Sequence, residues 1–495
     1  MNKIVMLVKK NWILILILLL GLFLRTYKSF EYFSYAHDLD LAAWIVRDVV
    51  VDKHIRLIGQ ETSTQGIFIG PLYYYLQIPF YLLFNMQPTG LIVMATLFGI
   101  FSIWSFYYIF ANVFQKKEIG YIAGFIYAIS FSTVMNDRGT VPTTPVFLWT
   151  GWFFYALDLI YKGNHRKAFI TLGVLIALIW HLNFGLVVLL TLIPFALYFS
   201  KKRIIVKDLV PGGLYLFILS LPLIAFEIKH SFIQTKALIT SLIQDQGSQL
   251  TLIDQSKRVY HISSQIITNI IWYPDQIYYY IVPLLTLIMT VYYFFKKKIS
   301  KYIFWIIILW SIPTLIFFSL YSKILSEYYL NGIILAWITM ITLILYNLLA
   351  HKILRIFGYI FLVIFIFINI SKMLNFQDNR EGYIYRRAIV SDIRKDAEAK
   401  GYPCVAVSYI TKPGYNLGYR YLFVLENMHV NNPESLSPVY TIVFPLDDTL
   451  FPVHKTFGAI GLIYPDYSRY NKEDVQKSCS GENSNLTDPM FGFTK

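Results

Sequence analysis

Apolar runs long enough to cross a lipid bilayer recur along this chain of 495 residues. A helix needs roughly 20 apolar residues to span the hydrocarbon, and the runs at 12–24, 91–111 and 302–320 reach or approach that length. Hydrophobic residues make up 56% of the chain and charged residues only 15%, which is little charge for a soluble protein of this length. The sequence therefore predicts an all-α polytopic membrane protein.

Lysine and arginine collect at alternate turns between the apolar runs, and positively charged loops stay on the cytoplasmic side during insertion. This pattern predicts about eleven transmembrane helices in the plasma membrane, with the amino terminus cytoplasmic and the carboxyl terminus outside. No small-residue cleavage pattern follows the first run, so we expect it to remain as the first span. The net charge of +14 is then a topology signal, and nucleic acid is not an expected partner. The basic clusters are Lys9-Lys10, Lys116-Lys117, Lys162 with Arg166-Lys167, Lys201-Lys202-Arg203, Lys296-Lys297-Lys298 with Lys301, and Lys352 with Arg355.

Three polar segments lie outside under this topology, at 27–88, 228–275 and 372–495. The first contains an aromatic, apolar run at 66–84, which cannot cross the bilayer without moving the next basic cluster outside. We expect it to form a helix in the membrane interface, where tyrosine rings are well accommodated among lipid headgroups. One or two interfacial helices are expected in 228–275, either gating a site or covering it passively.

Two aspartates, Asp38 and Asp40, follow the first apolar run, and short outer turns add further polar groups. A charge at the bilayer centre costs roughly 2.5–3.5 kcal/mol on insertion scales, and a place at a helix end avoids that cost. Each residue alone fits an interfacial anchor or a helix cap as well as a functional group. Their common side of the membrane favours a site. The residues of the short turns are Arg138, His181, Lys323, Glu327 and Tyr328.

In layout and in several short motifs the chain resembles the GT-C superfamily of membrane glycosyltransferases, in the branch with protein O-mannosyltransferases and lipid A aminoarabinose transferases. The resemblance covers residues 1–371. It departs from the family pattern at Leu39, where members often have glutamate, and at Gly70, where they often have proline. The matching motifs are Asp38-Leu-Asp40, Gly70-Pro-Leu-Tyr-Tyr-Tyr75, Arg138 with Pro142, and Ser326-Glu-Tyr-Tyr-Leu330.

The resemblance implies transfer of a sugar from a polyprenyl-phosphate donor to a hydroxyl of a lipid, glycan or protein acceptor, with inversion. Asp38 matches the first family acid and is expected to be the general base, while the departure at Leu39 leaves the role of Asp40 undecided. Cations must stabilise the leaving phosphate. The expected donor-binding residues are Arg47, Arg138, His181, Lys323, Glu327 and Tyr328.

Other interpretations of these residues stay open. Asp38 and Asp40 fit a helix amino-terminal cap, and because residues two apart on a helix face different ways, we expect at most one to point into a site. His181, at a helix end, is more often structural. The acids lack the compact spacing of a dedicated cation site, so no cofactor is expected, although a divalent cation stays open.

The competing functional class is a transporter or flippase for lipid-linked glycans. A transporter predicts charged or broken helices at the bilayer midplane, lining a path. In this chain the spans are poor in charge and the polar groups gather on one side. That asymmetry favours an enzyme acting at the outer face.

Beyond residue 371 the composition becomes that of a soluble domain, so we divide the chain into a transmembrane part, 1–371, and an extracytoplasmic part, 372–495. A helix expected over 386–400 precedes short apolar runs at 404–409 and 440–444 that are typical of strands, which predicts a small α/β domain. The only two cysteines, Cys404 and Cys479, lie there, and both a disulfide and two free thiols remain open. The segment Tyr419-Arg420-Tyr421 fits a glycan contact or, as we favour, a strand face.

Overall fold

The computed structural model of the chain describes residues 2–62, 64–243, 251–274, 276–321, 326–412, 418–446, 452–481 and 483. These residues divide into two compact units. The first unit comprises Met1–Tyr27, Glu61–Tyr73 and Ala95–Phe376, and the second comprises Lys28–Gln60, Tyr74–Met94 and Gln377–Lys495. The chain thus leaves the second unit and returns to it twice, so the predicted outer segment 27–88 is shared between the units.

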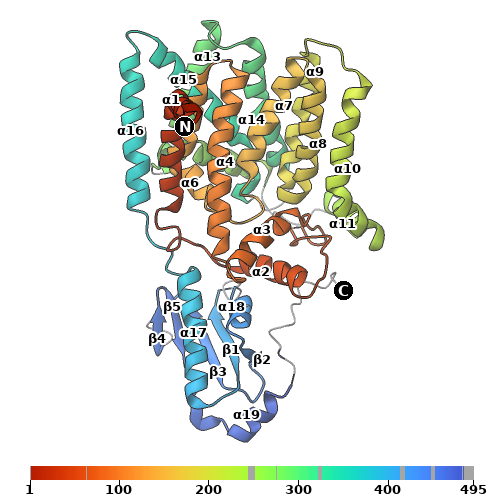
Figure 1. The fold of residues 1–495 in the computed structure, drawn as a ribbon, viewed down its shortest axis with the longest axis vertical. Coiled ribbons are helices and arrows are strands. Elements are labelled where there is room, and N and C mark those ends of the chain that lie inside the picture. Colours follow the sequence, from red (N-terminus) through yellow and green to blue (C-terminus); the bar gives the residue numbers. More distant parts are fainter. Residues whose placement is uncertain are drawn as a thin grey trace. The chain divides into compact units, whose positions relative to one another are not determined.

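The first unit is a bundle of long apolar helices that stand side by side (Figure 1). Helix α8 packs against α7 and α10, and α15 packs against α5, α13 and α16. The helices are α1 (Asn2–Thr26), α5 (Lys117–Ile129), α6 (Phe131–Asp137), α7 (Val146–Tyr161), α8 (His165–Leu182), η1 (Phe184–Thr191), α9 (Leu192–Tyr198), α10 (Val206–Lys229), α11 (Ile233–Ile243), α12 (Leu252–Thr268), η2 (Gln276–Tyr278), α13 (Ile281–Phe295), α14 (Lys301–Leu320), η3 (Glu327–Ile333), α15 (Ile334–Ala350) and α16 (Arg355–Leu374), with α3 (Leu72–Leu83) and α4 (Gly90–Val113) continuing into the second unit.

Small residues let neighbouring helices approach closely in this bundle. At the crossing of α8 and α10, a Cβ atom added to Gly173 would collide with the backbone of Gly212, and one added to Gly212 would collide with the backbone of Phe169. Because apolar lipid gives no hydrophobic drive for helix association, such close backbone packing is what stabilises helix pairs in membranes. The two glycines therefore set the closest approach of α8 and α10.

Within the described residues, six helices are long and apolar enough to cross a membrane, and α5 with α6, bent by 70°, makes a seventh if the pair is one span. This result confirms a polytopic helical membrane protein. The prediction of about eleven crossings is not confirmed, because the remaining apolar helices are shorter than the roughly 20 residues of a straight span. These shorter helices are Asn11–Thr26, Val146–Tyr161, Phe184–Tyr198 and Ile281–Phe295.

The predicted helices outside the main spans are present. Helix α3 lies within the aromatic run 66–84, and α11 and α12 lie within 228–275. Thr251 caps the amino terminus of helix α12, and its side chain accepts a hydrogen bond from the backbone N–H of Asp254. Its residue Val259 packs in a buried cluster with Phe318 of α14. The location of these helices in the membrane interface stays a prediction.

The second unit contains a mixed five-stranded sheet with strand order β2-β1-β3-β5-β4. Strand β1 pairs in parallel with β2 and β3, whereas β5 is antiparallel to β3 and β4. Helix α17 runs along the sheet and contacts β4 and β5 (Figure 1). The predicted small α/β domain is present. Its elements are α17 (Tyr383–Lys400), β1 (Cys404–Thr411), α18 (Arg420–Leu425), β2 (His429–Asn431), β3 (Val439–Phe444), β4 (Lys455–Phe457), β5 (Ile460–Ile463), η4 (Tyr467–Arg469) and α19 (Lys472–Ser478), and the unit also holds α2 (His37–Val50).

One element of this unit was predicted incorrectly. The segment Tyr419-Arg420-Tyr421 was expected to be a strand face, but Arg420–Leu425 forms helix α18 and Tyr419 precedes it as the cap residue. Three consecutive residues of this helix, Tyr421 to Phe423, are buried. A strand with one buried face would bury only alternate residues. Three consecutive buried residues instead fit a short helix that is surrounded by protein.

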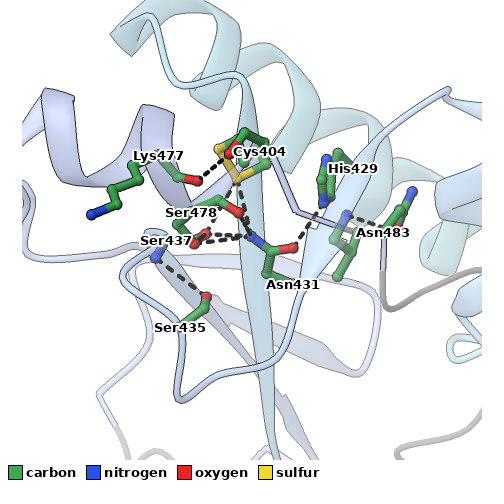
Figure 2. Close-up of a disulfide and its surroundings, with 11 residues drawn as sticks. Cys404, His429, Asn431, Ser435, Ser437, Lys477, Ser478 and Asn483 are labelled. Atoms are coloured by element: carbon green, nitrogen blue, oxygen red, sulfur yellow. Dashed lines mark hydrogen bonds between the residues drawn. A yellow bond between two sulfur atoms is a disulfide. The ribbon is translucent and has the colours of Figure 1, made fainter.

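The two cysteines form a disulfide, which the sequence alone had left open. Cys404 begins β1 and Cys479 follows α19, with their Cα atoms 5.5 Å apart and a separation of 75 positions in the sequence. Figure 2 shows the polar side chains around this bond. The Asn431 amide donates hydrogen bonds to Ser437 Oγ, at 2.8 Å, and to the Ser478 carbonyl oxygen, at 3.2 Å. The disulfide and this network together fasten α19 to the parallel end of the sheet.

Replacing both cysteines by alanine is expected to lower the free energy of unfolding by about 4 kcal/mol, since the bond closes a long loop in the unfolded chain. Thermal unfolding of the purified full chain in detergent measures the change, with the exposed Ser480→Ala as a matched control. Equal unfolding temperatures for the double variant and wild type would contradict the prediction. So would thiols that react in denatured, unreduced wild type.

Candidate active site

Helix α2 carries both acids of the motif in its first turn. The cap residue is Ala36, with extended backbone and no side-chain cap bond, so the alternative that an aspartate caps this helix is wrong. Residues advance by about 100° along a helix, which puts positions 38 and 40 on opposite faces. Asp38 is exposed and Asp40 is buried, which confirms that the two acids do not point the same way.

Asp38 is the more accessible of the two carboxylates. Among the residues that the structure describes, no side chain or backbone group forms a hydrogen bond or ion pair with its carboxylate. The partial positive charge of the helix amino terminus favours a negative side chain in the first turn. Asp38 is thus a solvent-facing hydrogen-bond acceptor.

Asp40 has a different environment and is only 5% exposed. Its Oδ1 atom accepts hydrogen bonds from the Tyr35 hydroxyl, at 2.9 Å, and from the backbone N–H of Tyr421, at 3.1 Å. Burial, together with the charge of Asp40, raises the pKa of Tyr35 well above its ordinary value. The Tyr35 hydroxyl therefore stays protonated and donates to the carboxylate. The Asp40 carboxylate thus accepts hydrogen bonds that hold the local structure together.

Arg47 lies on α2 nine positions after Asp38. That spacing turns a residue by about half a revolution and moves it about 13 Å along the axis, so α2 directs these two side chains to opposite faces. Arg47 pairs with Asp52, at 2.8 Å, and its guanidinium lies 5.5 Å from the centroid of the Trp44 ring. Its side chain is 23% exposed. Donor binding by Arg47 stays a prediction.

Arg138 ends helix α6, where its guanidinium serves the backbone. Its Nη2 atom donates to the carbonyl oxygen of Leu24, at 2.6 Å, and to that of Tyr27. These carbonyls lie at the end of α1, where a helix leaves its last C=O groups without intrahelical partners. Arg138 therefore caps α1. A phosphate bound to Arg138 would share the guanidinium with these two backbone carbonyls.

A buried ion pair, which the sequence patterns do not reveal, lies beside Arg138. Asp137 accepts hydrogen bonds from Arg25 Nη2, at 2.6 Å, and from the Tyr127 hydroxyl, at 2.7 Å. Arg25 also donates to the carbonyl of Ala128, at 3.1 Å, close to the bend between α5 and α6. Both charged side chains are at most 4% exposed. The sequence signal for this pair is an arginine and an aspartate at the ends of apolar runs, because charges buried there need partners of opposite charge.

His181, in the last turn of α8, is 1% exposed. The backbone N–H of Leu72 donates to its Nδ1, at 3.3 Å, so the proton lies on Nε2, which donates to the Leu219 carbonyl at 2.9 Å. The backbone of Gly70 packs on the ring, and a Cβ atom there would collide with it. These contacts favour the structural interpretation of His181 and explain glycine where the family often has proline.

The late turn that is predicted to lie outside is helix η3, which begins at Glu327. Glu327 and Tyr328 are exposed. Asn183 holds this turn in place, because its amide donates to the Tyr328 carbonyl, at 3.1 Å, and its Oδ1 accepts from the Gly185 N–H, at 2.8 Å. The predicted donor-binding residue Lys323 lies outside the described residues.

The predicted site residues are thus positioned by different parts of the fold. Asp38, Asp40 and Arg47 belong to the second unit, and the candidates of the later turns belong to the first. Among the described residues, no group of three or more histidine, cysteine or acidic side chains is arranged to hold a metal ion. The independence from a metal cofactor stays a prediction.

The fold is shared with a solved structure of low sequence identity. The structure is similar to that of ArnT from Cupriavidus metallidurans bound to undecaprenyl phosphate, with a TM-score of 0.57 and 11% identity, over 93% of this chain and 99% of that chain. It also matches the oligosaccharyltransferase AglB from Archaeoglobus fulgidus, in complex with an inhibitory peptide and a dolichol-phosphate, with a TM-score of 0.46 and 12% identity, over 88% of this chain and 70% of that one. No protein-family model and no curated protein sequence matches the chain.

The buried ion pair gives a prediction about stability. Replacing Arg25 by methionine leaves the buried charge of Asp137 without its cation and is expected to lower the free energy of unfolding by about 3–5 kcal/mol. Adding Asp137→Asn should restore much of this loss, because the amide oxygen still accepts from Tyr127. Unfolding in detergent measures both variants.

The matched control is Arg469→Met, which removes an exposed pair with Asp466, at 3.2 Å. Exposed pairs contribute about 0–1 kcal/mol, so the control should unfold close to wild type. Equal effects of Arg25→Met and Arg469→Met would show that the buried pair does not stabilise the bundle.

Proposed function

We propose that this protein is a membrane glycosyltransferase that moves a sugar from a polyprenyl-phosphate donor to an acceptor hydroxyl. The observation that carries the proposal is the match to ArnT over 93% of this chain and 99% of that protein, whose structure holds undecaprenyl phosphate. Fold alone does not define activity. The second support is local, because an exposed acid stands in the first turn of α2, where the family motif has its first acid.

Asp38 is the proposed general base. Its carboxylate takes the proton of the acceptor hydroxyl while the acceptor oxygen forms a bond to the anomeric carbon of the sugar. The bond from that carbon to the phosphate oxygen breaks, and polyprenyl phosphate leaves with the electron pair. Attack opposite the leaving group inverts the anomeric configuration, so no glycosyl-enzyme intermediate forms.

The leaving phosphate gains negative charge in this step and needs cationic partners. Arg47, Arg138 and Lys323 are the proposed partners. The exposed Glu327 and Tyr328 are proposed to bind hydroxyl groups of the sugar, since a carboxylate and a phenol both accept hydrogen bonds. We leave His181 out of this set because the backbone occupies both of its ring nitrogens. The acceptor is a hydroxyl-bearing lipid, glycan or protein.

The chemistry is proposed to take place outside the plasma membrane, with the amino terminus in the cytoplasm. Two observations support this orientation. Basic clusters alternate along the sequence in the pattern of cytoplasmic loops. The disulfide of the second unit is typical of an oxidising compartment.

Cysteine labelling tests this orientation, since the two native cysteines are paired and do not react with maleimides. The exposed positions Gln65 and Lys117 suit it. In intact cells an impermeant maleimide is expected to label Gln65→Cys and to label Lys117→Cys only after permeabilisation. Labelling of both positions from the same side would contradict the orientation.

Asp38→Asn tests the chemistry in purified protein in lipid with a panel of polyprenyl-phosphate sugars. Loss of the base is expected to lower kcat by about 10²–10⁴, with little change in unfolding temperature because Asp38 is exposed. The matched control is Glu31→Gln, an exposed acid of the same outer segment, which should transfer sugar at the wild-type rate. Full turnover by Asp38→Asn would remove Asp38 as the base.

A further inference from the structure

The acidic segment and the C-terminal α/β domain form one compact unit, although hundreds of residues separate them in sequence. Asp40 joins them directly, because Tyr421, 381 residues further along the chain, donates its backbone N–H to Asp40 at 3.1 Å. Tyr35 donates its hydroxyl to the same carboxylate oxygen at 2.9 Å. A buried carboxylate is tolerated when it is hydrogen-bonded. Asp40 thus fixes the first turn of α2 to the start of α18.

Tyr421 is the centre of this contact and is 1% exposed. Its hydroxyl donates to the carbonyl oxygen of Met86, at 2.8 Å. Its ring packs edge-on against Trp44 of α2, with centroids 6.2 Å apart, and against Tyr81 of α3, with centroids 6.3 Å apart. One residue of the C-terminal domain therefore contacts α2, α3 and the turn after α3.

Tyr383, at the start of α17, makes a second connection. Its backbone N–H donates to the carbonyl of Phe33, at 3.2 Å, and its hydroxyl donates to Gln87 Oε1, at 2.7 Å. The centroid of its ring lies 5.6 Å from the centroid of the Tyr35 ring. Tyr35 is therefore held between Tyr383 and the carboxylate of Asp40.

A close backbone approach lies at the start of α2 itself. Gly418 has φ of +91°, and a Cβ atom there would lie 2.9 Å from the carbonyl carbon of Ala36, the cap residue of the helix. Only glycine combines this backbone angle with so little space. The C-terminal domain thus contacts the residue from which α2 starts.

We infer that Asp40 is a positioning residue and that the C-terminal domain, through Tyr421 and through the contact of Tyr383 with Tyr35, holds α2 so that Asp38 keeps a fixed direction. The inference rests on the proposed function, since it assigns the base to Asp38. It gives the two acids different roles, with Asp38 in the reaction and Asp40 in positioning α2. The C-terminal domain is then part of the catalytic machinery, even if it touches no substrate.

The opposite assignment makes Asp40 a second reacting or ion-binding carboxylate. The substitution Asp40→Asn distinguishes this role from a positioning role. The hydrogen bonds from the Tyr35 hydroxyl and from the Tyr421 backbone N–H both end on one oxygen of Asp40, Oδ1. The amide oxygen of asparagine can accept both, but asparagine is neutral and cannot take up a proton as a carboxylate does. A positioning role therefore survives Asp40→Asn, whereas a reacting carboxylate does not.

The experiment compares Asp40→Asn, Asp40→Ala and Asp38→Asn in purified full-length protein. Sugar transfer gives kcat and the KM of the donor, and hydrogen exchange of the amides of 37–50 reports how firmly α2 is held. We expect Asp40→Asn to stay within about threefold of the wild-type kcat. Asp40→Ala should lose on the order of 10- to 100-fold in kcat through misplacement of the base, with faster exchange across α2. Asp38→Asn should lose activity with wild-type exchange.

Two further variants secure the result. Tyr35→Phe removes one donor and leaves the backbone bond from Tyr421, so exchange of α2 should rise less than in Asp40→Ala and remain measurable if Asp40→Ala does not fold. Glu31→Gln, exposed in the same outer segment, should leave both exchange and kcat unchanged.

The outcomes distinguish this inference from the proposed function. Absence of transfer by wild type with any donor would overturn the glycosyltransferase, while hydrogen exchange, which needs no substrate, would still test the contact. Unchanged exchange in both Asp40→Ala and Tyr35→Phe would overturn the positioning role. So would an Asp40→Asn protein as inactive as Asp38→Asn with α2 still protected, because Asp40 would then be a catalytic residue.

Discussion

Backbone N–H and C=O groups in hydrocarbon have no water to bond, so each must be satisfied within its own segment. The apolar segments of this chain are helices for that reason. Charged side chains are under the same constraint, since an unpaired charge is costly in apolar surroundings. Arg25 forms an ion pair with Asp137 at 2.6 Å, and Asp158 forms one with Lys162 at 2.7 Å. Glycines at the α8–α10 crossing then allow the satisfied helices to pack closely.

The second unit places two acids of one helical turn in opposite environments. Asp38 is exposed, whereas Asp40 is buried and bonded to a residue near the far end of the chain. Helix periodicity alone separates their faces, but the contacts of Tyr421 decide which face is buried. The acidic segment and the small α/β domain therefore depend on each other, which a division of the chain at residue 371 does not convey.

Local patterns predicted much of this structure. Long apolar runs gave the helices, and short apolar runs between turns gave strands β1 and β3, because periodicity and length are properties of the sequence itself. The short segment at Tyr419 was assigned wrongly, since a brief aromatic run fits helix and strand alike. The disulfide stayed undecided because two cysteines 75 residues apart carry no distance information.

The site was less predictable for the same reason. Asp38 could be selected by its place in a motif, but the bonds that define Asp40 and Asp137 join residues 381 and 112 positions apart. Only the folded chain shows that Tyr421 reaches Asp40, or that backbone groups occupy both nitrogens of His181. Such pairings arise from tertiary packing and leave no periodic signal in one sequence.

The most direct test of the account is the fate of the sugar–phosphate bond when purified protein in sealed vesicles meets a polyprenyl-phosphate sugar and an acceptor alcohol. A glycosyltransferase of the proposed kind releases free polyprenyl phosphate and forms a new glycoside of inverted anomeric configuration, both detectable by mass spectrometry and NMR. Movement of the intact lipid-linked sugar across the bilayer, with that bond unbroken, would contradict it and identify a flippase.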